Sequence, residues 1–161
     1  MSNHEKVNTA LLAFTENQKS KLKIIANILI PTSEEHQIPS AADDVIFVDI
    51  LLTAAVEANT TAAALTKLGT LARSQYAEEF DQLSAEKQNL TVRVFREKNP
   101  DEFALLLTIT CACYYRDDRV MRSLNMETRA PFPLGFTVEQ GEWSLLDPVK
   151  SRPKMYRKVG K

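Results

Sequence analysis

The chain has 161 residues, of which 44% are hydrophobic and 25% are charged, and its formal net charge is -1. A chain of this length can bury about two-thirds of its unfolded surface in a single domain without disulfides or metals. This composition excludes a disordered chain, and the near-zero charge argues against a nucleic-acid partner.

The first clear helix signal is a capping box formed by Thr15 and Gln18. In such a box the cap side chain and the side chain three residues later each accept a backbone N–H of the first turn. An apolar stripe follows, and Pro31 disfavours helical geometry for the residue before it. The sequence predicts a helix over 16–29 and a polar surface loop over 31–39.

A second helix is predicted to start with Ser40, with Asp43 three residues later, and to run to about Val56. The triplet Asn59–Thr61 is a candidate break. Gly69 is either a stop or a close-packing point in the helical stretch that follows.

The next two helices are predicted to start at Ser84 and at Asn99. Asn99 suits an N-cap, Pro100 suits the first helical position, and Glu102 completes a capping box. This last helix runs to Tyr114 and is apolar on most sides, which predicts a central position in the core.

Helical structure is expected to stop at Arg129, since four of the seven prolines and three of the four glycines follow it. The predicted fold class is therefore all-α, a compact helical domain of about five helices with an irregular Pro/Gly-rich C-terminal arm. The domain is placed at 15–128, after an N-terminal extension at 1–14, and the arm at 129–161 packs on a partner or on the domain.

The sequence contains no glycine-rich phosphate loop, HExxH motif, CxxC pair, CxxCH haem attachment or G-x-S-x-G elbow. Its two histidines, His4 and His36, offer little for a transition-metal site. Cys111 and Cys113 point about 200° apart on a helix, so small buried hydrophobes are the favoured interpretation. We expect no cofactor and no metal in this chain.

Three carboxylates are candidates for catalytic acids. Asp49 interrupts an apolar stretch alone, and a lone carboxylate supports no general acid/base pair. Asp117 and Asp118 are adjacent on a helix and diverge by about 100°. A structural role is favoured for Asp49, the adjacent pair gives poor support for an enzyme, and no catalytic residue is predicted.

Targeting signals are weak. No apolar run approaches the ~18–20 residues of a membrane span, so no direct span is expected. The stretch Val7–Phe14 is too short and too polar for a signal core, and no arginine precedes Arg73.

The order of several short motifs resembles a known family. These are Ile25-Ala26-Asn27, Leu29-Ile30-Pro31, Ser40-Ala41, Val48-Asp49, Tyr114-Tyr115, Asp118-Arg119-Val120, Pro131-Phe132-Pro133-Leu134-Gly135, Trp143-Ser144-Leu145-Leu146-Asp147-Pro148, Arg152-Pro153 and Tyr156-Arg157. Together they look like the gluconate 2-dehydrogenase subunit 3 family, over roughly Ile24 to Arg157.

The resemblance implies a non-catalytic small subunit of a flavin-dependent sugar or polyol dehydrogenase, which stabilises the catalytic subunit or assists its maturation or export. FAD is then held by a partner flavoprotein of the glucose-methanol-choline type and haem c by a multihaem cytochrome c subunit. A periplasmic, membrane-associated complex is implied. Many small subunits of the family begin with a twin-arginine signal that this chain lacks, so a trimmed chain, export with a partner and a cytoplasmic location all stay open.

Partner contact is expected at aromatic, leucine and arginine residues, because aromatics and arginine carry much of the energy of protein interfaces. They are Tyr114, Tyr115, Arg119, Phe132, Leu134, Phe136, Trp143 and Leu146. The competing interpretation is a core that the arm forms with its own domain, in a self-contained helical interaction or regulatory module. The six basic residues of 150–161 fit either a solvated tail or contact with an acidic partner or anionic headgroups.

Overall fold

The computed structural model describes residues 12–128, 135 and 141–153. Within these residues every regular element is helical, and the only β-type pairing is an isolated bridge between Ser33 and Ile38 in the 31–39 loop. The predicted all-α fold class is therefore confirmed. The chain divides into two compact units, Met1–Thr128 and Arg129–Lys161, which are described separately as the helical unit and the C-terminal unit.

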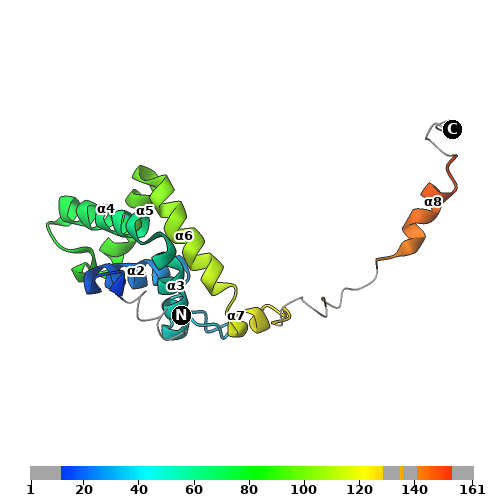
Figure 1. Cartoon of the computed structure of the whole chain (residues 1–161), viewed down its shortest axis with the longest axis horizontal. Coiled ribbons are helices and arrows are strands. Elements are labelled where there is room, and N and C mark those ends of the chain that lie inside the picture. Colours follow the sequence, from blue (N-terminus) through cyan, green and yellow to red (C-terminus); the bar gives the residue numbers. More distant parts are fainter. Residues whose placement is uncertain (1–11, 129–134, 136–140, 154–161) are drawn as a thin grey trace. The chain divides into compact units, whose positions relative to one another are not determined.

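Within residues 12–128, the helical unit contains five long helices and one short helix that the structure describes in full (Figure 1). They are α2 (Glu16–Leu29), α3 (Asp44–Ala54), α4 (Ala58–Tyr76), α5 (Ala85–Lys98), α6 (Pro100–Tyr114) and α7 (Asp118–Ser123), with 3-10 turns η1 (Ala55–Glu57) and η2 (Phe80–Gln82). The bounds of α2 agree with the prediction.

Local capping sets most of the helix starts. The capping box of Thr15 and Gln18 is complete, and the Ser84 hydroxyl accepts the Lys87 N–H. The second helix differs from the prediction, because its cap is Asp43, whose carboxylate accepts the Val45 N–H at 3.1 Å. A carboxylate at this position also interacts favourably with the positive end of the helix.

The chain breaks between α3 and α4 at η1, earlier than the predicted break at Asn59–Thr61, which lies inside α4. Gly69 does not stop α4. A Cβ atom at Gly69 would lie 2.5 Å from Nζ of the buried Lys21, so this glycine leaves room for the Lys21 side chain of α2 against α4.

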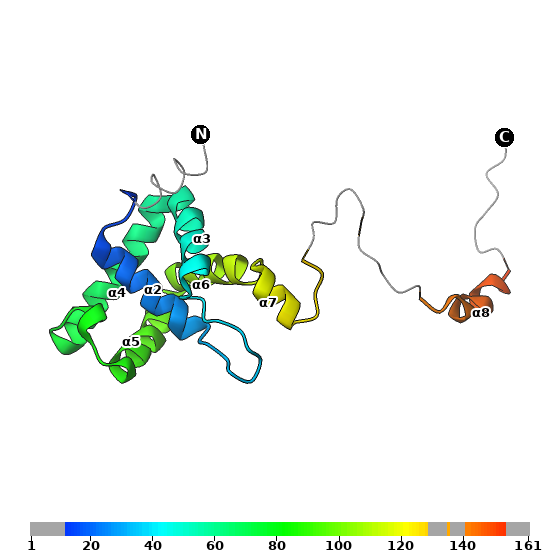
Figure 2. The same ribbon diagram turned by 90° about the horizontal axis from the view of Figure 1, so that it is seen from below.

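The core lies between α6 and the helices that contact it, α2, α3, α4 and α5 (Figure 2). Fully buried side chains include Leu65, Phe95 and Leu106. The expected central position of α6 is confirmed. Phe14, the last residue of the predicted N-terminal extension, is also a core residue, because packing begins before α2.

One stretch, Asp44–Tyr76, is long and apolar enough to cross a membrane by length and composition. Core helices of soluble proteins meet the same criterion, and α3 and α4, which make up this stretch, both pack against α6. The expectation that the chain has no membrane span stays a prediction.

Among its described residues, the C-terminal unit contains a 3-10 turn, η3 (Trp143–Leu146), that continues into the short helix α8 (Asp147–Lys150). This helical segment was not expected in the Pro/Gly-rich arm. Pro148 is tolerated because it lies in the first turn of α8, where a backbone N–H has no helical partner to lose.

Candidate partner-binding surface

Two adjacent tyrosines at the end of α6 have opposite environments. Tyr114 is 1% exposed, and its hydroxyl donates to the Pro39 carbonyl at 3.1 Å. Burial raises the pKa of the Tyr114 hydroxyl. Tyr115 is 55% exposed and meets the Tyr114 ring edge to face, with 5.2 Å between centroids. Tyr114 is therefore a core residue, the alternative expected for it, and Tyr115 is accessible to a partner.

Arg119 joins the starts of two helices. Its guanidinium binds Asp43, the cap of α3, at 2.7 Å and Asp117, the cap of α7, at 3.0 Å. The hydrogen bonds from Arg119 hold the pKa of both carboxyls below their usual range, and they raise the pKa of Arg119. Because its donors already serve two carboxylates, Arg119 has a structural role within the helical unit, and its use as a partner contact stays a prediction.

Asp49 forms an ion pair with Arg116, and both residues line a shallow hollow. The Arg116 Nε donates to Asp49 at 2.7 Å, and Arg116 Nη2 donates to the Thr53 hydroxyl at 3.0 Å and to the Cys113 sulfur at 3.4 Å. The hydrogen bond to Asp49 raises the pKa of Arg116. The predicted hydrogen-bonded, structural role of Asp49 is confirmed.

The buried thiol of Cys113 lies in the same cluster and donates to the Thr53 hydroxyl at 3.3 Å. Burial raises the pKa of this thiol, although Arg116 opposes the shift. Thiolate is the nucleophilic form, so a buried thiol with a raised pKa is a poor nucleophile. The arrangement favours packing over chemistry for Cys113, as predicted, whereas Cys111, also predicted to be buried, is only partly buried.

The pair Asp117 and Asp118 is also used structurally. Asp117 caps α7 by accepting the Arg119 N–H at 2.8 Å, and Asp118 pairs with Arg122 at 3.0 Å. Across residues 12–128 and 141–153, no group of three or more histidine, cysteine or carboxylate side chains is placed to hold a metal ion. The described residues thus offer no assembled metal centre.

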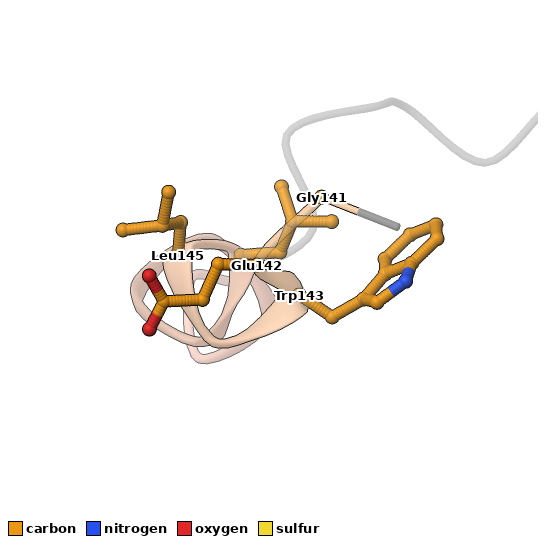
Figure 3. Close-up of a pocket in the computed structure, with 5 residues that line it drawn as sticks. Gly141, Glu142, Trp143 and Leu145 are labelled. Atoms are coloured by element: carbon orange, nitrogen blue, oxygen red, sulfur yellow. The ribbon is translucent and has the colours of Figure 1, made fainter. Parts of the chain in front are cut away.

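Apolar side chains are exposed on η3 of the C-terminal unit. Trp143 is 64%, Leu145 72% and Leu146 43% exposed, and with Gly141 and Glu142 they line a shallow hollow (Figure 3). Figure 3 shows the side chains of Trp143 and Leu145 projecting from the turn in different directions. This turn has the character expected of a contact surface, with aromatic and aliphatic groups concentrated in four residues.

The remaining predicted contact residues, Phe132, Leu134 and Phe136, lie outside the described residues. Sequence reasoning missed Leu145, the most exposed of the apolar residues in η3. The signal available in the sequence was that Leu145 lies between Ser144 and Leu146, beside a residue that was predicted to contact a partner. It also missed that Arg116 and Arg119 pair with α3, because those partners lie 67 and 76 residues away in the chain.

No family model, no curated protein and no solved structure gives a significant match to this chain. The resemblance described above therefore rests on the order and spacing of the chain's own motifs.

Proposed function

We propose that this chain is a non-catalytic small accessory subunit of a flavin-dependent sugar or polyol dehydrogenase complex, which stabilises the catalytic subunit or assists its maturation or export. The identity of the complex comes from the motif order over Ile24 to Arg157, which is similar to the gluconate 2-dehydrogenase subunit 3 family. In this complex FAD belongs to a glucose-methanol-choline type flavoprotein, haem c belongs to a cytochrome subunit, and the location is periplasmic.

The observation that supports a role in binding a partner is the exposure of apolar side chains on the turn η3. Trp143, Leu145 and Leu146 are 64%, 72% and 43% exposed, and exposed apolar side chains that lie together mark an interaction site. Tryptophan is among the residues most enriched at the energetic centres of protein interfaces. A turn of this kind gains stability when a partner covers it.

A non-catalytic role is supported by the carboxylates of the helical unit. Asp49, Asp117 and Asp118 each pair with an arginine at 2.7–3.0 Å. A carboxylate that is engaged by a guanidinium of its own fold is less available to a substrate, so it makes a poor candidate for a general base. The chemistry of the complex is accordingly assigned to the flavoprotein.

The test is co-expression of the tagged chain with a glucose-methanol-choline type flavoprotein from the same source organism. We expect the two chains to co-purify with flavin in stoichiometric amount, and the chain purified alone to carry neither flavin nor haem. Trp143→Ala should weaken the complex, whereas Leu90→Ala, which trims a 44% exposed leucine of α5, serves as the matched control. A chain that purifies alone with a stoichiometric chromophore, or that never retains the flavoprotein, contradicts the proposal.

The alternative is a self-contained helical interaction or regulatory module. It is favoured by Tyr114 and Arg119, two predicted contact residues whose polar groups are satisfied inside the helical unit. On this alternative the chain binds a partner that contains no flavin, the arm at 129–161 belongs to the chain's own core, and loss of residues 129–161 lowers the stability of the helical unit.

A further inference from the structure

The outer side of α6 is an exposed helix face without charge. The chain has no charged residue from Phe103 to Tyr115, although the exposed positions of the neighbouring helix α5 include arginine, lysine and glutamate. The exposed residues of α6 in this stretch, with Tyr115 at its end, are Ala104, Thr108, Ala112 and Tyr115. With the partly buried Cys111 they follow the alternating spacing of three and four residues at which two helices pack along their length.

This face is left over after the core of the helical unit has formed. The inner side of α6 contacts α2, α3, α4 and α5. On its outer side no other helix of the helical unit lies beside it (Figure 1). A helix that is apolar on most sides is stable when both sides are covered, so the outer side of α6 is a candidate contact surface.

The two ends of this face have complementary shapes. At the C-terminal end, Tyr115 is 55% exposed. Long side chains on a helix lean toward its N-terminus, so this ring extends back over the face. At the N-terminal end, a hollow of about 480 Å³ is lined by Leu29, Arg96, Pro100, Phe103, Ala104 and Leu107. A projecting ring and a largely apolar hollow thus lie at opposite ends of one helix face.

The two ends also carry opposite charges. Asp101 is an exposed carboxylate in the first turn of α6, and Arg116 follows the last turn with 56% of its side chain exposed. Two α6 helices that run antiparallel bring the acidic end of each beside the basic end of the other. Their helix dipoles are then also opposed, whereas a parallel pair sets like ends side by side.

We propose that the outer face of α6 is the interface of a homodimer, in which two copies of this chain pack their α6 helices antiparallel across a two-fold axis at Thr108. Ala104 then faces Ala112 of the second copy, because each lies four residues from Thr108. Small side chains at these positions let the two helix axes approach closely. Tyr115, about 10 Å from the axis, enters the hollow beside Ala104 of the second copy.

Symmetry favours a second copy over an unrelated helix. In a two-fold interface each feature and its complement lie at equal distances from the axis. On α6 the two alanines meet this condition, and Asp101 and Arg116 meet it to within one residue. One helix face is smaller than a standard protein interface, so the dimer is weak and its population depends on concentration.

The first experiment measures the mass of the purified full chain, without any flavoprotein, by sedimentation from about 1 μM to about 1 mM. We expect the mass to rise from 18.1 kDa toward twice that value. Ala104→Glu puts like charges into the interface and should raise the dissociation constant at least about tenfold. Ala63→Glu makes the same change at an exposed alanine of α4 and should alter it less than about twofold. Both variants should keep the circular dichroism spectrum of the parent.

The second experiment tests the antiparallel arrangement with cysteines. Thr108→Cys in a Cys111→Ser background should form a disulfide-linked dimer on oxidation, because the two-fold axis brings the two copies of this residue together. Thr60→Cys, at an exposed position of α4 in the same background, is the matched control and should stay monomeric. Native Cys111 residues lie about 9 Å apart along an antiparallel pair, too far for a disulfide, but level with each other in a parallel pair.

Four results would overturn the proposal. A mass of 18.1 kDa at every concentration excludes the dimer. Equal weakening by Ala104→Glu and Ala63→Glu, or loss of the dimer in Trp143→Ala, moves the contact to another surface. Efficient cross-linking through native Cys111 shows a parallel pair. Because the chain is tested alone, failure of the proposed dehydrogenase complex does not affect these results.

Discussion

In the helical unit, large apolar side chains such as Leu65 and Phe95 are fully buried, whereas no residue of η3 or α8 in the C-terminal unit is buried. The polar groups differ in the same way. Arg119 of the helical unit bridges two helix caps, while the Lys150–Asp147 pair of α8 is local and about two-thirds exposed. Stability therefore resides in the helical unit, whereas the apolar groups of η3 in the C-terminal unit are exposed.

The largest change in the free energy of unfolding is expected from Phe95→Ala in α5 of the helical unit. Phe95 is 0% exposed, and removing a buried phenylalanine side chain costs about 3–5 kcal/mol of unfolding free energy through lost burial and a cavity. Urea unfolding followed by circular dichroism measures it. A cost below about 1 kcal/mol would mean that Phe95 is not part of a tightly packed core.

A smaller loss is expected from Tyr114→Phe, which removes only the hydroxyl that donates to the Pro39 carbonyl. Losing this hydrogen bond should lower the unfolding free energy by about 0.5–1.5 kcal/mol, the usual net contribution of one intramolecular hydrogen bond. Tyr115→Phe is the matched control, because Tyr115 is exposed and should tolerate the change. If both variants unfold like the parent chain, the hydroxyl of Tyr114 does not anchor the loop before α3.

Arg119→Gln should remove a pH-dependent contribution of less than about 1 kcal/mol, because the pairs are partly exposed. Asp43 and Asp117 have folded pKa values below the ordinary 3.8, so their pairing stabilises the fold above that pH and is lost as pH falls through the lower folded pKa values. The variant should thus be less stable than the parent near neutral pH and equal to it in strong acid. Urea unfolding at several pH values measures the difference, and a constant gap at every pH would contradict the pairing.

The smallest effect is expected in the C-terminal unit. Trp143→Ala changes an exposed side chain and should shift the unfolding free energy of the helical unit by less than about 0.5 kcal/mol. A chain ending at Thr128 should likewise stay helical and soluble. Thermal unfolding followed by circular dichroism tests both. A large loss of stability in either one would place the C-terminal unit in the core of the helical unit and favour the self-contained module.

Much of the fold could be predicted from the sequence, because helix starts are encoded locally. The Thr15 box and the Ser84 cap use hydrogen bonds that reach three residues along the chain, and both are present. The apolar character of α6 correctly placed it at the centre. The boundary between α3 and α4 was less well predicted, since Asn59–Thr61 are compatible with a helix interior when tertiary packing supports it.

The candidate surface was less predictable, because a sequence does not show which of two similar residues is covered. Tyr114 and Tyr115 are identical in type, and only the packing of α6 against its neighbours buries the first and exposes the second. Leu145, more exposed than the predicted Leu146, was missed for the same reason.

The sequence by itself determined the helical class, the local caps and the concentration of basic residues after η3, since each depends on residue types at short separations. The tertiary structure decided where the long side chains find partners. Glu102, predicted to complete a capping box with Asn99, instead pairs with Lys67 of α4, and Asn99 makes no side-chain cap bond. Arg119 likewise reaches Asp43 across 76 residues. Such pairings depend on which helices become neighbours in the fold. Burial of the shared core determines those neighbours.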